Sequence, residues 1–171
     1  MIRKIKDNLW EITFNSFGSC VYLLKIKNKN LLIDTSSLAN RQELIKDLKS
    51  IGINPEEINI LLLTHNHFDH VENIELFKKA EIYGSTKDFK CKLVKDIKKL
   101  KIPEIKVIET PGHTFGSLSF IYEDILFSGD TLFKNGIGRT DFPNSSSKDM
   151  ENSLEKLEKI KYEFLCPGHI D

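Results

Sequence analysis

The sequence has few cysteines, no excess of charge and no long apolar run. Its 171 residues include three cysteines, which are widely spaced and never form a C-x-x-C pair, so no disulfide framework is predicted. Basic and acidic residues number 25 each, so no net field attracts nucleic acid or a membrane surface. No apolar run approaches the ~20 residues of a membrane helix, and the N-terminus lacks the apolar core of a signal peptide. These absences predict a cytoplasmic protein without nucleic-acid or membrane partners.

The length and patterning predict one globular domain over residues 1–171. The first third is typical of an antiparallel meander, and helical and strand patterns alternate after it. Strands are predicted over residues 9–14, 20–27, 31–33, 58–63, 81–83, 105–108, 118–122, 125–127 and 164–166. The first predicted helix is capped by Ser37 or Asn40, carries Leu44 to Ile51 on one face and ends at Gly52. Further helices are predicted around residues 74–77, from residue 85 to about 99, and around residues 150–160. This order suggests two packed sheets with helices outside.

Histidine is scarce but concentrated. Three of the five histidines lie within residues 64–70, directly after a predicted strand. His65 and His67 are two residues apart, so they point the same way only in an extended segment. The chain must then turn if Asp69 and His70 are to point to the same place. The remaining candidates also follow predicted strand ends, which indicates one cleft at a sheet edge; these are His113, Asp130 and His169.

Imidazole and carboxylate ligands without thiolates fit zinc, and also iron or manganese. We expect two divalent ions roughly 3.5–4 Å apart, sharing a water or hydroxide. Taken singly, the later ligands have simpler interpretations: a surface or core histidine, a turn aspartate and a disordered tail. Ligation is favoured because no histidine remains outside the scheme. The predicted ligands are His65, His67 and His113 for the first ion, Asp69, His70 and His169 for the second, and Asp130 as the bridge.

Several motifs, in order along the chain, resemble those of the metallo-β-lactamase superfamily. Residues 65–70 read HNHFDH and match its H-x-H-x-D-H signature. Later matches are TPGHTFGS at 110–117, SGD at 128–130 and PGH at 167–169, and LIDT at 32–35 extends the match over most of the chain. GRTDF at 138–142 further resembles the branch of glyoxalase II (hydroxyacylglutathione hydrolase) and persulfide dioxygenase. The resemblance implies an α+β fold, the αββα four-layer sandwich of two mixed sheets with helices on the outer faces, and the ligand roles given above.

The sequence departs from the family pattern after the histidine cluster. Val71-Glu72-Asn73 stands where the family often has Gly-Gly, so a different turn is expected there. The helical domain that binds glutathione in full-length glyoxalase II has no counterpart before Asp171.

Four further residues are predicted to support the metal centre or to contact substrate. Arg139 and Asp141 have two interpretations. They form an ion pair that holds the loop over residues 134–147, or Arg139 orients an anionic substrate or a carboxylate beside the metal. Asp34 and Thr114 are predicted to support ligands from strand ends, with a simple turn as the alternative for Asp34.

The leading hypothesis is a metal-dependent hydrolase that uses a metal-bridged hydroxide on a small-molecule thioester or another activated ester. Asp69 is the predicted catalytic residue, because it would orient the hydroxide as well as bind metal. One alternative is a mononuclear iron persulfide dioxygenase that uses His65, His113 and Asp130. Another is a non-catalytic metal-binding interaction module. A serine nucleophile is not expected, because the sequence contains no G-x-S-x-G motif.

Overall fold

The computed structural model describes residues 1–170, which divide into two compact units. The first unit comprises Met1–Leu63 and His67–Tyr83, and the second comprises Thr64–Asn66 and the chain from Gly84 onward. Each unit has its own mixed sheet. The expectation of one domain over residues 1–171 stays a prediction. No helix within the described residues is both long and apolar enough to span a membrane.

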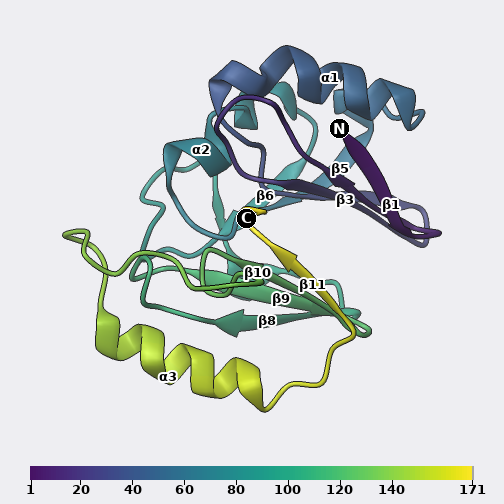
Figure 1. The fold of residues 1–171 in the computed structure, drawn as a ribbon. Helices are drawn as coiled ribbons and strands as arrows, with labels where there is room; N and C mark the ends of the chain where they lie inside the picture. Colours follow the sequence, from purple (N-terminus) through teal and green to yellow (C-terminus); the bar gives the residue numbers. More distant parts are fainter. Residues whose placement is uncertain (171) are drawn as a thin grey trace. The chain divides into compact units, whose positions relative to one another are not determined.

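The sheet of the first unit begins as the predicted meander and continues with parallel strands (Figure 1). Neighbouring pairs are antiparallel from the first to the fourth strand and parallel from the fourth to the sixth. The first strand was not predicted, because none of its residues is fully buried and it lacks a strong apolar pattern. In order, the strands are β1 (Ile2–Lys6), β2 (Leu9–Ile12), β3 (Val21–Ile26), β4 (Lys29–Ile33), β5 (Ile58–Leu62) and β6 (Glu81–Gly84).

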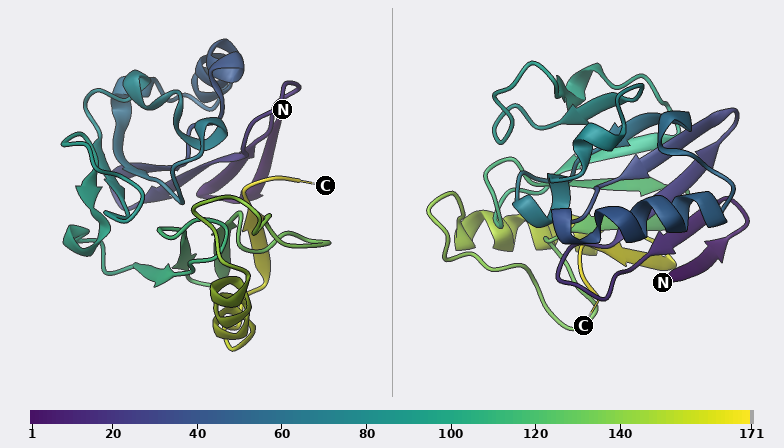
Figure 2. Two further views of the ribbon diagram at one scale, coloured as in Figure 1. Left: turned by 90° about the vertical axis from the view of Figure 1, so that its left-hand side faces the viewer. Right: turned by 90° about the horizontal axis from the view of Figure 1, so that it is seen from above.

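One long helix, α1 (Arg41–Ser50), lies over a face of this sheet (Figures 1 and 2). It buries Leu44 and Leu48, as an amphipathic helix requires. Leu32 and Leu61 of the central strands are fully buried as well. Gly52 follows it with φ of +82°, the left-handed conformation that ends many helices. Shorter elements complete the unit: the 3-10 turns η1 (Leu38–Asn40), η2 (Pro55–Glu57) and η3 (Ile74–Leu76), and the helix α2 (Phe68–Val71).

The second unit has a four-stranded sheet in the order β11 (Phe164–Pro167), β10 (Ile125–Gly129), β9 (Leu118–Tyr122) and β8 (Ile105–Glu109). β9 is antiparallel to both of its neighbours, β8 and β10, whereas β10 and β11 are parallel. The helix α3 (Ser147–Glu158) covers one face of this sheet (Figures 1 and 2). The elements are β7 (Lys95–Asp96), η4 (Ile97–Lys99), β8 (Ile105–Glu109), β9 (Leu118–Tyr122), β10 (Ile125–Gly129), α3 and β11 (Phe164–Pro167).

The close packing of α3 depends on a glycine. Gly112 has φ of +148°, and a Cβ atom on it would lie 2.5 Å from the Cα of Met150 in α3. Ser153, one turn further along the helix, donates a hydrogen bond to the carbonyl oxygen of Pro111 at 2.7 Å. The loop that carries His113 is therefore held against α3 by two contacts, the close packing of Gly112 and the hydrogen bond to Pro111.

The helix predicted over residues 85–99 is wrong. A single turn closes through the N–H of Phe89 and the carbonyl of Ser85, and it does not continue. Phe89 and Val94 are both buried, and a Cβ atom on Gly84 would meet both side chains. Residues five apart do not share one helix face, so tertiary packing overrides the local pattern. Leu93, which the helix would have buried, is 58% exposed.

Candidate metal centre

Strand direction brings four of the predicted ligands to one edge of the second unit's sheet. Asp130 and His169 follow β10 and β11, which are parallel, so both leave the sheet at the same edge. β8 ends at this edge and leads into the loop that carries His113. The antiparallel strand β9 begins here, and the N–H of Leu118 in it bonds to the carbonyl of Thr64, the neighbour of His65.

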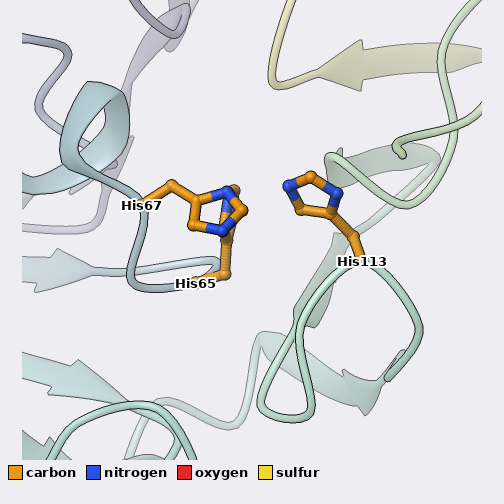
Figure 3. Close-up of side chains that lie close together, drawn as sticks. All are labelled: His65, His67 and His113. Atoms are coloured by element: carbon orange, nitrogen blue, oxygen red, sulfur yellow. The ribbon is translucent and has the colours of Figure 1, made fainter. Parts of the chain in front are cut away.

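The side chains of these four residues converge. The rings of His65 and His113 face one another with centroids 4.8 Å apart and planes at 84° (Figure 3). Asp130 Oδ2 lies 3.5 Å from Nε2 of His113 and 3.4 Å from Nε2 of His169. One carboxylate oxygen thus stands between two imidazoles, which is the position expected of a bridging ligand.

The spacing fits a shared metal ion better than a hydrogen bond. An N–H···O hydrogen bond spans about 2.7–3.2 Å between heavy atoms. Two ligand atoms about 2.0–2.1 Å from a tetrahedral zinc ion lie about 3.3–3.4 Å apart. The distances of 3.4 and 3.5 Å match the second value. Imidazole and carboxylate groups with this spacing are therefore suited to hold a divalent cation; His113 and Asp130 are buried, and His169 is partly exposed.

The tautomer of His113 is set by the loop over residues 134–147. Its Nδ1 lies 2.8 Å from the backbone carbonyl oxygen of Arg139. A carbonyl only accepts, so Nδ1 carries the proton and the electron pair of the neutral ring is on Nε2. Gly138 makes this approach possible, because a Cβ atom there would lie 2.0 Å from the carbonyl oxygen of Asp130 and 2.9 Å from His113 Nδ1.

The first unit prepares His70 in a corresponding way. His70 is fully buried, and its Nδ1 lies 2.8 Å from Oδ2 of Asp34. Asp34 follows β4 as the histidine cluster follows β5, and these strands are parallel neighbours. The carboxylate accepts a hydrogen bond from Nδ1–H, so the electron pair of the neutral ring is on Nε2, the atom that a metal ion would bind. The prediction that Asp34 supports a ligand thus has a direct contact behind it.

The local backbone also agrees with the predicted turn. His67 is extended, with φ of −93° and ψ of 148°, and the short helix α2 begins at the next residue. Asp69 and His70 lie in this helix and are buried. His67, which is on the same loop as His65 (Figure 3), is partly exposed. The carbonyl of Asp69 accepts from the N–H of Ser19, which fixes the helix on the loop before β3.

Asn73 is an important residue that sequence reasoning did not identify. It is fully buried, and its side-chain amide donates to the carbonyls of Thr35, Ser36 and Ser37 at 2.7–3.3 Å. Arg41 donates to its side-chain oxygen at 3.0 Å. These bonds hold the loop after β4, in which Asp34 and Ser36 have φ near +60°. The different turn expected at Val71-Glu72-Asn73 therefore has a structural use.

Arg139 and Asp141 form the ion pair of the first interpretation. The guanidinium donates two hydrogen bonds to the carboxylate, at 2.9 and 2.8 Å, and both side chains are about two-thirds exposed. Hydrogen bonds from Arg139 hold the pKa of Asp141 below its ordinary value. The guanidinium also lies over the ring of Phe142, which is in edge contact with His113. The main-chain oxygen of Arg139, rather than its charge, contacts a predicted ligand.

Thr114 is fully buried and donates to Oδ2 of Asp88 at 2.7 Å. Asp88 was missed because it falls in the segment wrongly predicted as helix. The signal that could have found it is positional: like the other candidates, it follows a strand end, in the polar run of residues 85–88 after β6.

A sequence model of the metallo-beta-lactamase superfamily matches residues 16–87 and 93–169. The chain therefore belongs to the metallo-β-lactamase superfamily, as its motifs predicted.

Two relatives with named activities match the chain. A protein of Methanocaldococcus jannaschii named "Probable metallo-hydrolase" is 40% identical over 133 residues, which are 77% of this chain and 65% of that protein. A hydroxyacylglutathione hydrolase of Buchnera aphidicola subsp. Baizongia pistaciae is 33% identical over 168 residues, which are 93% of this chain and 60% of the relative. The chain spans less than two thirds of the length of either relative.

Two solved structures share the fold. The crystal structure of TTHA1623 in a di-iron-bound form has a TM-score of 0.81 and 25% identity, covering 94% of this chain and 92% of that one. BLEG-1, a B3 metallo-beta-lactamase, has a TM-score of 0.76 and 25% identity, covering 95% and 92%. These likenesses confirm the predicted fold class, an α+β metallo-β-lactamase fold with two mixed sheets.

Proposed function

We propose that the chain is a metal-dependent hydrolase that cleaves a small-molecule thioester or another activated ester. Two ions would supply an activated water and Lewis-acid stabilisation of the developing oxyanion. The proposal extends to the ligands predicted from the sequence, which are His65, His67, Asp69, His70, His113, Asp130 and His169.

One observation carries the proposal: Asp130 Oδ2 stands 3.4–3.5 Å from two imidazole nitrogens at one sheet edge. A hydrogen-bonded structural cluster would draw these atoms closer. The relatives add the reaction class, since both are named as hydrolases. Hydroxyacylglutathione, a thioester, is the substrate of one of them by name.

The chain's own residues prepare the site in three ways. Arg139 and Asp34 fix the protons of His113 and His70 on Nδ1, so each ring presents its Nε2 electron pair. Burial of Asp130 and His65 limits access of bulk water and strengthens local electrostatics. Asp69 is the residue we assign to orienting the attacking water. None of these roles requires a covalent enzyme intermediate.

Zinc is the metal we propose, because imidazole and carboxylate ligands without thiolate are typical of it. Iron is the main competitor, since TTHA1623 was crystallised with two iron ions. Elemental analysis of protein purified without added metal separates the two. We expect close to two ions per chain. One iron per chain with oxygen consumption on glutathione persulfide would establish the dioxygenase instead.

The decisive test combines substrate cleavage with known metal content. A panel of thioesters, lactones and oxygen esters is assayed with wild type, Asp130→Asn, His67→Ala and Asp69→Ala. We expect thioester cleavage by wild type and a fall in kcat/KM of at least about a hundredfold in each variant. Asp124→Asn, in the turn between β9 and β10, is the matched control. Unchanged cleavage in the three site variants would refute the site assignment.

A further inference from the structure

Asp88 forms hydrogen bonds with the loop that carries His65 and with the loop that carries His113. Its Oδ2 accepts the backbone N–H of Asn66 at 3.2 Å and the hydroxyl of Thr114 at 2.7 Å. Its main-chain oxygen also accepts from the side-chain amide of Asn66 at 3.2 Å. Asn66 directly follows His65, and Thr114 directly follows His113. One carboxylate oxygen therefore joins the two residues next to the two rings.

The loop after His113 closes tightly on this carboxylate. A Cβ atom on Gly116 would lie 2.4 Å from Asp88 Oδ1 and 2.9 Å from its N atom. Ser117 bonds both the N–H and the hydroxyl of Thr114, at 3.0 and 2.8 Å. The Thr114 hydroxyl is thus fixed between two oxygens, and its bond to Asp88 is one of the short, charge-assisted kind.

We propose that Asp88 is a positioning residue that sets the separation of His65 and His113, and through it the affinity and geometry of the first metal ion. This inference rests on the proposed function, because it assumes that the two histidines bind metal. The ring centroids of His65 and His113 are 4.8 Å apart. A metal ion tolerates ligand displacements of only a few tenths of an ångström. Asp88 touches neither ring, so it acts through Asn66 and Thr114.

The chemistry explains why a carboxylate is used. One ionised oxygen accepts from two donors that approach from different loops. In Asp88→Asn, a neutral oxygen would accept more weakly, and the flipped amide would place an NH₂ group against two donors. In Asp88→Ala, both donors lose their partner, and the two loops lose the atom that joins them.

The experiment measures metal binding instead of turnover. Cobalt(II) is titrated into metal-free protein, its dissociation constant is obtained by chelator competition, and its visible d–d spectrum is recorded. We expect Asp88→Ala to weaken binding of one ion by about 10- to 100-fold and to change the spectrum. Asp88→Asn should fall between Asp88→Ala and wild type. Asp96→Ala is the matched control, because Asp96 accepts the backbone N–H of Lys98 within its own turn.

A second pair of variants covers the case in which Asp88→Ala does not fold. Thr114→Val removes the hydroxyl that donates to Asp88, whereas Ser117→Ala leaves the hydrogen bond between Thr114 and Asp88 in place. We expect weaker cobalt binding and a changed spectrum in Thr114→Val only. If a folded Asp88→Ala or Thr114→Val protein keeps the wild-type affinity and spectrum, the positioning role is refuted.

The outcomes also separate this inference from the proposed function. Wild type that binds two ions but cleaves no ester refutes the hydrolase proposal and leaves the role of Asp88 to be decided by the titration. Wild type that binds no metal refutes both. Wild type that binds and cleaves, with Asp88 variants identical to it in affinity and spectrum, refutes only the inference about Asp88.

Discussion

In the first unit, Nδ1 of His70 faces the carboxylate of Asp34, whereas in the second unit Nδ1 of His113 faces the backbone carbonyl of Arg139, and both distances are 2.8 Å. The carboxylate adds a negative charge beside its histidine, and the carbonyl adds only a dipole. A hydrogen bond to a charged acceptor is about twice as strong as one to a neutral acceptor. The two candidate ligands are therefore oriented alike but are not electronically equal.

The two acceptors also depend on different parts of the chain. Asp34 lies in a loop that is held by two side chains: the Asn73 amide donates to the carbonyl of Thr35, and the Thr35 hydroxyl donates to the carbonyl of His70 in α2. The Arg139 carbonyl is held by close packing, since Gly138 lies directly against Asp130. A polar network thus supports one histidine and steric fit supports the other. A different substitution should therefore disrupt each of the two arrangements.

Asn73→Ala should have the largest effect on stability. It removes the donor to three loop carbonyls in a fully buried position and leaves Arg41 without its acceptor. We expect a loss of about 3 kcal/mol in the free energy of unfolding, measured by urea titration. The exposed Asn152 on α3 is the control, and its replacement by alanine should change stability by less than about 0.5 kcal/mol. Equal losses in both variants would contradict the network.

Gly138→Ala should have the next largest effect. The added Cβ would lie 2.0 Å from the carbonyl oxygen of Asp130, so the loop must move and carry the Arg139 carbonyl with it. We expect a loss of about 2 kcal/mol in unfolding free energy, together with weaker metal binding. At Gly136, in the same loop, a Cβ would meet no described atom within 4 Å, so Gly136→Ala should be close to wild type. If both glycines tolerate alanine equally, steric fit does not hold this acceptor.

Asp34→Asn and Arg139→Ala compare the two acceptors directly. The first substitution removes the charge from the acceptor of His70, and we expect metal affinity to fall about tenfold or more. The second removes a side chain but leaves the carbonyl in place, so affinity should change by less than about threefold, because the exposed ion pair with Asp141 contributes little. Chelator competition measures both. The reverse ranking would show that the Arg139 side chain acts on the site.

The places of the candidate ligands in the fold could be predicted because they depend on short-range patterns. An apolar strand followed by a polar turn identifies a strand end, and parallel strands place such ends at one edge. This reasoning placed the candidates His113, Asp130 and His169 after strand ends, where the structure also has them. Most strand bounds were predicted to within a few residues for the same reason. The exceptions are β1, whose half-exposed residues give a weak signal, and β7, which lies in the segment predicted as a helix.

The supporting contacts could not be predicted, because they join segments far apart in the sequence. Asn73 bonds carbonyls 36–38 residues away, and Asp88 bonds residues 22 and 26 positions away. The acceptor of His113 is a main-chain oxygen, which every residue has, so no side chain marks it. The wrong helix over residues 85–99 has the same origin: its apolar spacing suits a helix, but packing against Gly84 decides the structure.

The smallest effect on stability is expected at an exposed ion pair next to Asp88 in the second unit. Nζ of Lys87 lies 2.9 Å from Oε2 of Glu109. The hydrogen bond from Lys87 lowers the pKa of Glu109 below its ordinary value of 4.5. A carboxyl with a lowered pKa in the folded state adds stability above its unfolded pKa and loses it as the pH falls through the folded one. We expect wild type to exceed Glu109→Gln by a few tenths of a kcal/mol at about pH 6.5 and by nothing at about pH 2.5. Urea titrations at the two pH values measure this, and a difference above about 1 kcal/mol would show that exposed charges, as well as Asp88, hold this part of the second unit.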